Sequence, residues 1–359
     1  MFAKVKRLFF IVLVNIAILG FGIVSLELIF GGWLNSQWLA RLNLIRDATI
    51  TYDITGLYES TNNTVLYTRD VHGLRGSFND PSEINILTVG GSTTDQRYIN
   101  DGETWQAVMQ QEFEAMGKEI VVANAGVDGQ STFGHIKNFE WWFPHIPNLK
   151  PQFILFYIGL NDFYKDAEYK YDGLETKEKR TIRHIFRENS ALYYFSRTLR
   201  NAYGAMFVLG IGHSSVNFAD IEWTEKPLQT GYDEIMAARL KAYAKRLTIL
   251  VNKTKQLGSI PIFVTQPYRK YRFINGTVQG IAEKSLYENV EINGVDYYHL
   301  MKKLDAVTLD NCQQNGEVCI DMAKDTLWEN EDFYDFTHMT PKGARKVGVY
   351  LVDKLKDVK

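Results

Sequence analysis

The sequence has few of the residues that would indicate a metal site or a disulfide-rich fold. Its 359 residues include two cysteines, Cys312 and Cys319, and seven histidines. The cysteines lack the second pair or the nearby histidines that a zinc site needs. The histidines form neither an H-E-x-x-H motif nor a closely spaced set. We therefore predict no metal site.

The sequence also lacks an excess of charge of one sign. It has 40 Lys and Arg against 42 Asp and Glu, a formal net charge of −2. This balance provides no bulk attraction to nucleic acid, so no nucleic-acid partner is expected. The 45% hydrophobic and 23% charged residues are ordinary for a globular protein, and the length allows one large domain or two smaller ones.

One segment departs from this average. Residues 8–30 carry a single charge, Glu27, near the far end, and about 20 such residues can cross a bilayer as a helix. Three basic residues precede the segment, so by the positive-inside rule the N-terminus stays in the cytoplasm. We predict a single-pass inner-membrane protein with a cytoplasmic tail at 1–7, an uncleaved signal anchor at 8–30, and a periplasmic remainder. The alternatives are a cleaved signal peptide and a buried helix of a soluble protein.

Export would favour a disulfide between Cys312 and Cys319. Closing so short a loop stabilises by roughly 2–3 kcal/mol in the chain-entropy model. Two unrelated buried thiols are the alternative.

From about residue 80 the sequence alternates between strand-like and helix-like segments. This alternation predicts a three-layer α/β/α sandwich around a five-stranded parallel sheet, in the flavodoxin-like order 2-1-3-4-5. The expected strands lie at 84–90, 119–126, 153–159, 260–267 and 318–322, and the expected helices at 105–116, 233–257, 297–309 and from Thr340 onward.

Two segments fall outside this pattern. Residues 31–80 are expected to form a stalk that links the anchor to a domain at 81–359. Residues 163–227 mix charged and aromatic stretches and interrupt the alternation, so we interpret them as an insertion. The insertion either covers the site as a lid or substrate wall or packs on the domain.

Chemically useful residues follow the ends of the expected strands. Ser92 follows the first strand, Gly129 the second and Asn161 the third, while Asp335 and His338 precede the last helix. Ligands of open parallel α/β sheets bind outside the carboxyl ends of the strands. The first three of these residues should therefore converge on one crevice.

These residue types suit nucleophilic catalysis. A serine hydroxyl needs a base, which His338 can supply, and Asp335 can orient that imidazole. An oxyanion on an attacked carbonyl needs donors, and the Ser92 N–H, the Gly129 N–H and the Asn161 amide are candidates. Each residue alone is an ordinary turn residue; only their joint placement indicates a site.

These blocks resemble the SGNH (GDSL-type) hydrolase superfamily. "VGGSTT" is similar to its first block, with Gly91 where the eponymous motif has Asp, and "NAGVDGQS", "IGLNDF" and "DFTH" are similar to the later blocks. "GLRG" and "DGETW" look like a bacterial, membrane-anchored subgroup that carries "GGST". The resemblance covers roughly residues 70–359 without the insertion. It implies Ser92 as nucleophile, His338 as base, Asp335 as its orienting acid, and Ser92, Gly129 and Asn161 as the oxyanion hole.

Three further residues are weaker candidates. His135 either reaches the cleft or packs in the interior, with packing favoured. Arg97 either binds an anionic substrate or is a solvated surface residue, with the surface role favoured. Asp162 is expected to anchor the turn after the third strand.

Together these observations predict a serine esterase that needs no cofactor and acts on an acylated small molecule or glycan, with O-acetyl groups of cell-envelope or exported glycans favoured. The alternatives are an O-acyltransferase that modifies an extracytoplasmic polysaccharide and a non-catalytic binding domain. No protein partner is indicated.

Overall fold

In the computed structural model, the described residues are 2–33, 39, 42, 44–165, 172, 186, 189–193, 195–196, 208–209 and 212–358. Much of the expected insertion at 163–227, and part of the expected stalk at 31–80, lies outside the described residues.

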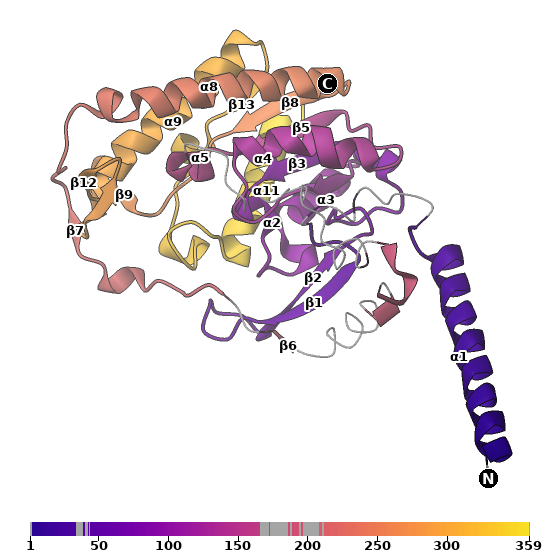
Figure 1. The fold of residues 1–359 in the computed structure, drawn as a ribbon. Coiled ribbons are helices and arrows are strands. Elements are labelled where there is room, and N and C mark those ends of the chain that lie inside the picture. The colour runs from indigo at the N-terminus through magenta and orange to yellow at the C-terminus, as the bar shows by residue number, and fades with distance from the viewer. Residues whose placement is uncertain are drawn as a thin grey trace.

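A five-stranded parallel sheet forms the centre of the molecule (Figure 1). Its spatial order, β13-β8-β5-β3-β4, is the order 2-1-3-4-5 when these strands are counted along the chain, and all neighbouring pairs are parallel. The fold class predicted from the sequence is therefore confirmed. The strands are β3 (Ile86–Gly90), β4 (Val122–Asn124), β5 (Phe153–Tyr157), β8 (Ile260–Val264) and β13 (Val318–Ile320).

Both faces of this sheet are covered by helices, as parallel sheets require. Along β5, Phe153, Leu155 and Tyr157 pack into one hydrophobic cluster, and Ile154 and Phe156 into another on the opposite face. Helices α3 and α11 pack into the first cluster, and helices α8 and α9 pack into the second. Helix α4 packs against α8. These helices are α3 (Trp105–Ala115), α4 (Thr132–Lys137), α8 (Tyr232–Gln256), α9 (Gly294–Gln314) and α11 (Pro341–Leu355).

Local capping sets where two of these helices begin. The Thr340 hydroxyl accepts a hydrogen bond from the Gly343 N–H, which confirms the expected start of the last helix. The helix expected at 297–309 begins earlier, because Asn293 and Asp296 form a capping box. Cys312 near its C-terminal end is disulfide-bonded to Cys319 in β13, with the Cα atoms 5.9 Å apart.

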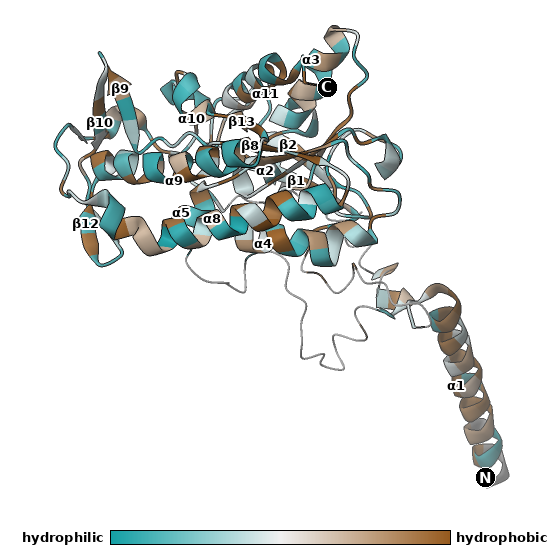
Figure 2. Cartoon of the chain, turned by 90° about the horizontal axis from the view of Figure 1, so that it is seen from above, coloured by the Kyte–Doolittle hydropathy of each residue, from teal (hydrophilic) through white to brown (hydrophobic). Residues whose placement is uncertain are grey.

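Helix α1 (Phe2–Phe30) projects away from the rest of the chain (Figure 1). Residues Val5–Phe30 have a mean hydropathy of 2.6 over their most apolar window, none of which is buried, and Figure 2 shows this helix as almost wholly hydrophobic. It is long and apolar enough to cross a membrane, a property that signal sequences share.

The described part of the expected stalk is a folded element of the α/β domain. Strands β1 (Ala48–Asp53) and β2 (Thr64–Arg69) pair as an antiparallel hairpin, and β6 (Val208–Leu209) extends it. Alternate side chains of the hairpin are buried against two tyrosines of the domain, Tyr98 and Tyr334. The described part of this stretch therefore does not form a linker.

Two small sheets that the sequence does not predict are formed by β7, which precedes α8, and by four strands between β8 and α9. One has the order β7-β10-β9 and the other pairs β11 with β12. Their strands are β7 (Trp223–Thr224), β9 (Tyr271–Ile274), β10 (Thr277–Ile281), β11 (Ser285–Tyr287) and β12 (Val290–Ile292). Three short α-helices also lie in the described residues: α2 (Ser92–Asp95), α5 (Leu160–Tyr164) and α10 (Met322–Asp325).

Candidate active site

Ser92 is the first residue of α2, directly after the turn that ends β3. The two glycines before it have no room for a side chain. A Cβ on Gly90 would overlap the Thr94 hydroxyl, and one on Gly91 would overlap the side-chain nitrogen of Asn161. Close approach, not a positive φ, requires glycine here, since Gly91 has a φ of −87°. The contact with Gly91 also shows that the Asn161 side chain lies beside the serine turn.

Ser92, His338 and Asp335 form a continuous hydrogen-bonded chain. The Oγ of Ser92 lies 2.7 Å from Nε2 of His338, and Nδ1 of His338 lies 2.7 Å from Oδ2 of Asp335. The other carboxylate oxygen of Asp335 accepts the backbone N–H groups of Thr337 at 2.7 Å and of His338 at 2.6 Å. Ser92 and the distant pair Asp335 and His338 thus have the geometry of a nucleophile, its base and the acid that orients the base.

The environment of Asp335 favours its charged form. Burial by itself raises the pKa of this carboxyl, but the hydrogen bonds and charge of His338 and two backbone N–H bonds outweigh it and hold the pKa below its ordinary value. An ionised Asp335 fixes the proton of neutral His338 on Nδ1, so that Nε2 faces the serine as an acceptor.

Two more rings surround His338, and one of them comes from the insertion. Tyr334 stacks on His338 with ring centroids 5.6 Å apart, and the His213 ring lies 4.4 Å away. Nδ1 of His213 lies 3.0 Å from the Tyr334 hydroxyl. Burial and the nearby His338 lower the pKa of His213, which favours a neutral ring beside the His338 imidazole. No local pattern in the sequence marked His213.

His213, Asp335 and His338 are also the one group among the described residues whose ligand atoms are close enough to hold a metal ion. Both ring nitrogens of His338 already have partners in Ser92 and Asp335. A metal would have to replace those bonds, so the arrangement fits a triad better than a metal centre.

Gly129 and Asn161 lie beside the serine turn. Gly129 has a φ of +71° and occupies the third position of a turn closed by the Gln130 N–H on the Val127 carbonyl at 3.0 Å, a position that favours glycine. Asn161 donates one amide N–H to the Gln130 carbonyl at 2.8 Å. Since an amide nitrogen carries two hydrogens, Asn161 retains a second N–H for a substrate oxygen.

A buried ion pair from outside the sequence motifs supports the Gly129 turn. Lys165 donates to the Gly129 carbonyl, and it pairs with Asp172 at 2.6 Å. Asp172 also accepts the N–H of Ser131 at 3.0 Å and its hydroxyl at 2.9 Å. The side chains of Lys165 and Asp172 are 6% and 4% exposed. Both belong to the expected insertion, so part of it packs under the turn.

Asp162 anchors the turn after β5, as expected. Its carboxylate accepts the Thr132 N–H at 3.2 Å and pairs with Arg246 at 3.2 Å. Arg246 in turn donates to the Thr132 hydroxyl at 2.6 Å. These bonds join the turn that carries Asn161 to the helix that follows Gly129.

The two other weak candidates, His135 and Arg97, are packed against or paired with other residues of the protein. His135 is 1% exposed, and burial lowers its pKa to about 4, so a neutral ring packs in the interior. Arg97 pairs with Asp128 at 3.3 Å and with Asp95 at 3.5 Å. The Arg97 side chain is therefore not freely solvated. Its charge is paired with two carboxylates of the protein and is not left over for an anionic substrate.

The β1–β2 hairpin supports the serine turn from behind. Arg69 pairs with Asp95, the last residue of α2, at 2.5 Å, and the Tyr67 hydroxyl donates to the same carboxylate at 2.8 Å. Arg75 donates to the carbonyls of Asp95 and Gln96 at 2.7 and 2.9 Å. Sequence reasoning missed this support because it read the segment as a stalk.

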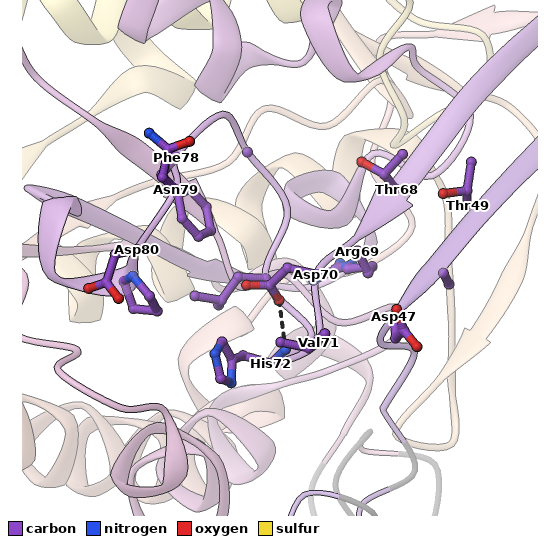
Figure 3. A pocket seen from close by; sticks show the side chains of 14 residues that line it. Asp47, Thr49, Thr68, Arg69, Asp70, Val71, His72, Phe78, Asn79 and Asp80 are labelled. Carbon is purple, nitrogen blue, oxygen red and sulfur yellow. Dashed lines mark hydrogen bonds between the residues drawn. The ribbon is translucent and has the colours of Figure 1, made fainter. Parts of the chain in front are cut away.

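A hollow of about 730 Å³ lies beside the end of this hairpin where β1 begins and β2 ends (Figure 3). Its lining runs from Asp47 to Pro81 and includes no triad residue. The carboxylate of Asp70 is engaged by the backbone N–H groups of His72 and Leu74 at 2.9 and 2.7 Å. This hollow is therefore separate from the candidate active site.

The sequence pattern of the family described as GDSL-like lipase/acylhydrolase matches residues 86–351, well over half of the chain. The chain belongs to this family. As a GDSL-like acylhydrolase it is a serine hydrolase that acts on esters. Among curated proteins, none matches the chain.

Solved structures include family members that are similar to this chain at low identity. A lipolytic protein of the G-D-S-L family from Desulfitobacterium hafniense is 13% identical, with 75% of this chain and 98% of that chain covered and a TM-score of 0.41. An acetylxylan esterase from Geobacillus stearothermophilus is 14% identical, with 75% and 93% covered and a TM-score of 0.41. A psychrotrophic esterase from Pseudoalteromonas sp. is 13% identical, with 76% and 97% covered and a TM-score of 0.39.

Proposed function

We propose that this GDSL-family chain hydrolyses O-acyl esters through an acyl-Ser92 intermediate. The observation that carries the proposal is the unbroken chain Ser92–His338–Asp335, with both of its side-chain hydrogen bonds at 2.7 Å. In a serine hydrolase, this arrangement activates the hydroxyl without a metal or cofactor.

The reaction has two halves. Nε2 of His338 takes the proton of Ser92 as Oγ attacks the acyl carbonyl, and the oxyanion accepts hydrogen bonds from the Ser92 and Gly129 N–H groups and the free amide N–H of Asn161. Collapse breaks the ester bond, and the leaving alcohol takes the proton from His338. Water then attacks the acyl group by the same route, which releases the acid and restores Ser92.

The proposed substrate is an O-acetyl group on a cell-envelope or exported glycan. Location supports this choice: helix α1 is long and apolar enough to span a membrane, and three basic residues precede its apolar stretch at 8–30. In this arrangement residues 1–7 are cytoplasmic, 8–30 are an uncleaved anchor, and the hydrolase domain is periplasmic. A reporter fused after Lys359 should be active only outside the cytoplasm.

The test of the activity uses the full chain in detergent with 4-nitrophenyl acetate. Ser92→Ala should lower kcat by about 10⁴-fold or more, while Ser60→Ala, at an exposed serine, should not change it. Equal rates for the wild type and Ser92→Ala would refute the proposal. With acetylated oligosaccharides, mass spectrometry should show release of acetate; acetyl groups moved onto acceptor sugars would instead identify a transferase.

A further inference from the structure

Glu27, the one charged residue between Leu8 and Phe30, is bound by the insertion. Its carboxylate accepts hydrogen bonds from the Ser190 hydroxyl at 2.6 Å and from the Ala191 and Leu192 N–H groups at 2.8 and 3.2 Å. The indole N–H of Trp33 adds a fourth at 2.8 Å. Glu27 is 8% exposed, although it belongs to a helix whose other side chains are largely exposed.

Backbone contacts join the same two segments. The Gly32 N–H donates to the Asn189 carbonyl at 2.8 Å. Gly31 has no space for a side chain, because a Cβ would lie 2.6 Å from that same carbonyl oxygen. The ring of Trp33 meets the ring of Phe186 edge-on, with centroids 5.6 Å apart. The end of α1, Phe186 and residues 189–192 therefore form one packed joint.

The depth of this joint follows from the length of the helix. Residues Val5–Phe30 comprise 26 residues, which as a helix extend about 39 Å, whereas the hydrocarbon core of a bilayer is about 30 Å thick. The last turn of α1, with Glu27, therefore reaches the polar interface of the membrane. A carboxylate is tolerated there, particularly when it is hydrogen-bonded.

Large apolar side chains are exposed around the joint. Phe186 is 51% exposed, Leu192 43%, Phe195 61% and Trp33 37%. Isolated exposed apolar residues need no explanation, but Trp33, Phe186 and Leu192 belong to the joint at the end of a helix that is long enough to span a membrane. Phe195 lies three residues further along the chain. Aromatic side chains concentrate at this level of membrane proteins, where one part of the ring is apolar and its surroundings are partly wet.

We propose that Phe186, Leu192 and Phe195 contact the bilayer that α1 spans, with their side chains inserted among the lipid headgroups and upper acyl chains. Glu27 holds their segment at the interface through its hydrogen bonds. The partner is a phospholipid surface, and the insertion sets the position of the hydrolase domain on it. This inference depends on the proposed membrane span and not on the esterase chemistry.

Site-directed spin labelling of the full chain in phospholipid nanodiscs tests the contact. Because Cys312 and Cys319 are bonded to each other, an introduced cysteine is the labelling site. Phe195→Cys reports on the segment, Ile18→Cys on the hydrocarbon core, and Leu286→Cys in β11, 72% exposed, on the aqueous phase. The measurement is the collision rate of each label with oxygen, which concentrates in lipid, and with a water-soluble nickel chelate.

The label at Phe195 should collide several-fold more with oxygen, and several-fold less with nickel, than the label at Leu286. A label at Phe195 that is as accessible to nickel as Leu286, while Ile18 is protected, would overturn the contact and leave the span standing. An Ile18 label open to nickel would overturn the span and the contact together. Neither result bears on hydrolysis of 4-nitrophenyl acetate.

The role of Glu27 is tested in the Phe195→Cys background. Glu27→Ala removes all four acceptor bonds, so the label should become several-fold more accessible to nickel. Glu27→Gln retains an acceptor oxygen and should have a smaller effect. If Glu27→Ala leaves the label as protected as before, Glu27 does not hold the segment.

Discussion

The triad and the groups that support it differ in exposure. The side chains of His338 and Asp335, which the proposed mechanism places at the reacting edge, are 18% and 20% exposed. The ion pairs Arg69–Asp95 and Lys165–Asp172, which hold the serine and Gly129 turns, are between 2% and 6% exposed. Chemistry thus occurs at a partly open edge, and buried charges position it. Changes at the edge should cost rate, and changes in the support should cost stability first.

Loss of the acid at the edge should have the largest effect. Asp335→Asn keeps the shape but not the charge, so the preferred tautomer of His338 changes and kcat should fall by about 10⁴-fold. Steady-state kinetics with 4-nitrophenyl acetate measures this, and a thermal melt should show little change. A kcat within tenfold of wild type would remove Asp335 from the proposed mechanism.

Breaking the buried Arg69–Asp95 ion pair should instead lower stability more than rate. Arg69→Met leaves Asp95 buried without its main counter-charge, so the free energy of unfolding should fall by about 3–5 kcal/mol, as measured by denaturant titration. Arg345→Met removes an exposed pair with Glu112 and should cost less than about 1 kcal/mol. The double variant Arg69→Met/Asp95→Asn should recover part of the loss; equal losses from Arg69→Met and Arg345→Met would contradict the contrast.

The buried His135 should make stability depend on pH. Its folded pKa of about 4 lies below the ordinary 6.5, chiefly because of burial. Between these values the unfolded chain binds a proton that the folded chain does not, so stability falls as the pH is lowered from 6.5 towards 4. The loss should reach about 3 kcal/mol. His135→Gln should flatten this part of the profile relative to wild type; parallel profiles would rule out His135 as the source.

The support of Gly129 should show the smallest effect on rate, in addition to the loss of stability expected when a buried ion pair is broken. Lys165→Met removes the donor to the Gly129 carbonyl, and the resulting shift of an oxyanion donor should lower kcat by about 10–100-fold with little change in KM. Lys165→Arg should restore part of the rate. Lys284→Met, at an exposed pair, is the control. A rise in KM without a fall in kcat would place Lys165 outside oxyanion positioning.

Much of the sheet and the triad was predictable because both follow local rules. Short apolar runs between helical repeats predict buried parallel strands, and strand ends share one edge of the sheet. That rule placed Ser92, Asn161 and Gly129 together before any contact was known. Thr340 and Pro341 likewise predicted the start of the last helix from the chemistry of capping.

The support was not predictable, because it depends on pairings between segments with no common pattern. The hairpin at 48–69 alternates for only a few residues on each strand, and nothing local shows that Tyr52 and Tyr67 pack on Tyr98. His213, Lys165 and Asp172 belong to a stretch whose composition resembles a surface insertion. Apart from the pairing of Lys165 with Asp172, their partners lie tens of residues away, so only the fold decides that they meet.

By itself, the sequence determined the parallel α/β sheet, the family and the residues that can perform ester hydrolysis, since these depend on periodicity and on turns that directly follow strands. Only the tertiary structure decided what keeps those residues in place: the buried ion pairs, the hairpin behind Ser92, and the joint between Glu27 and residues 189–192. A buried charge is stable only where a partner of opposite charge reaches it. That partner can come from a remote part of the chain, so a local sequence pattern does not reveal it.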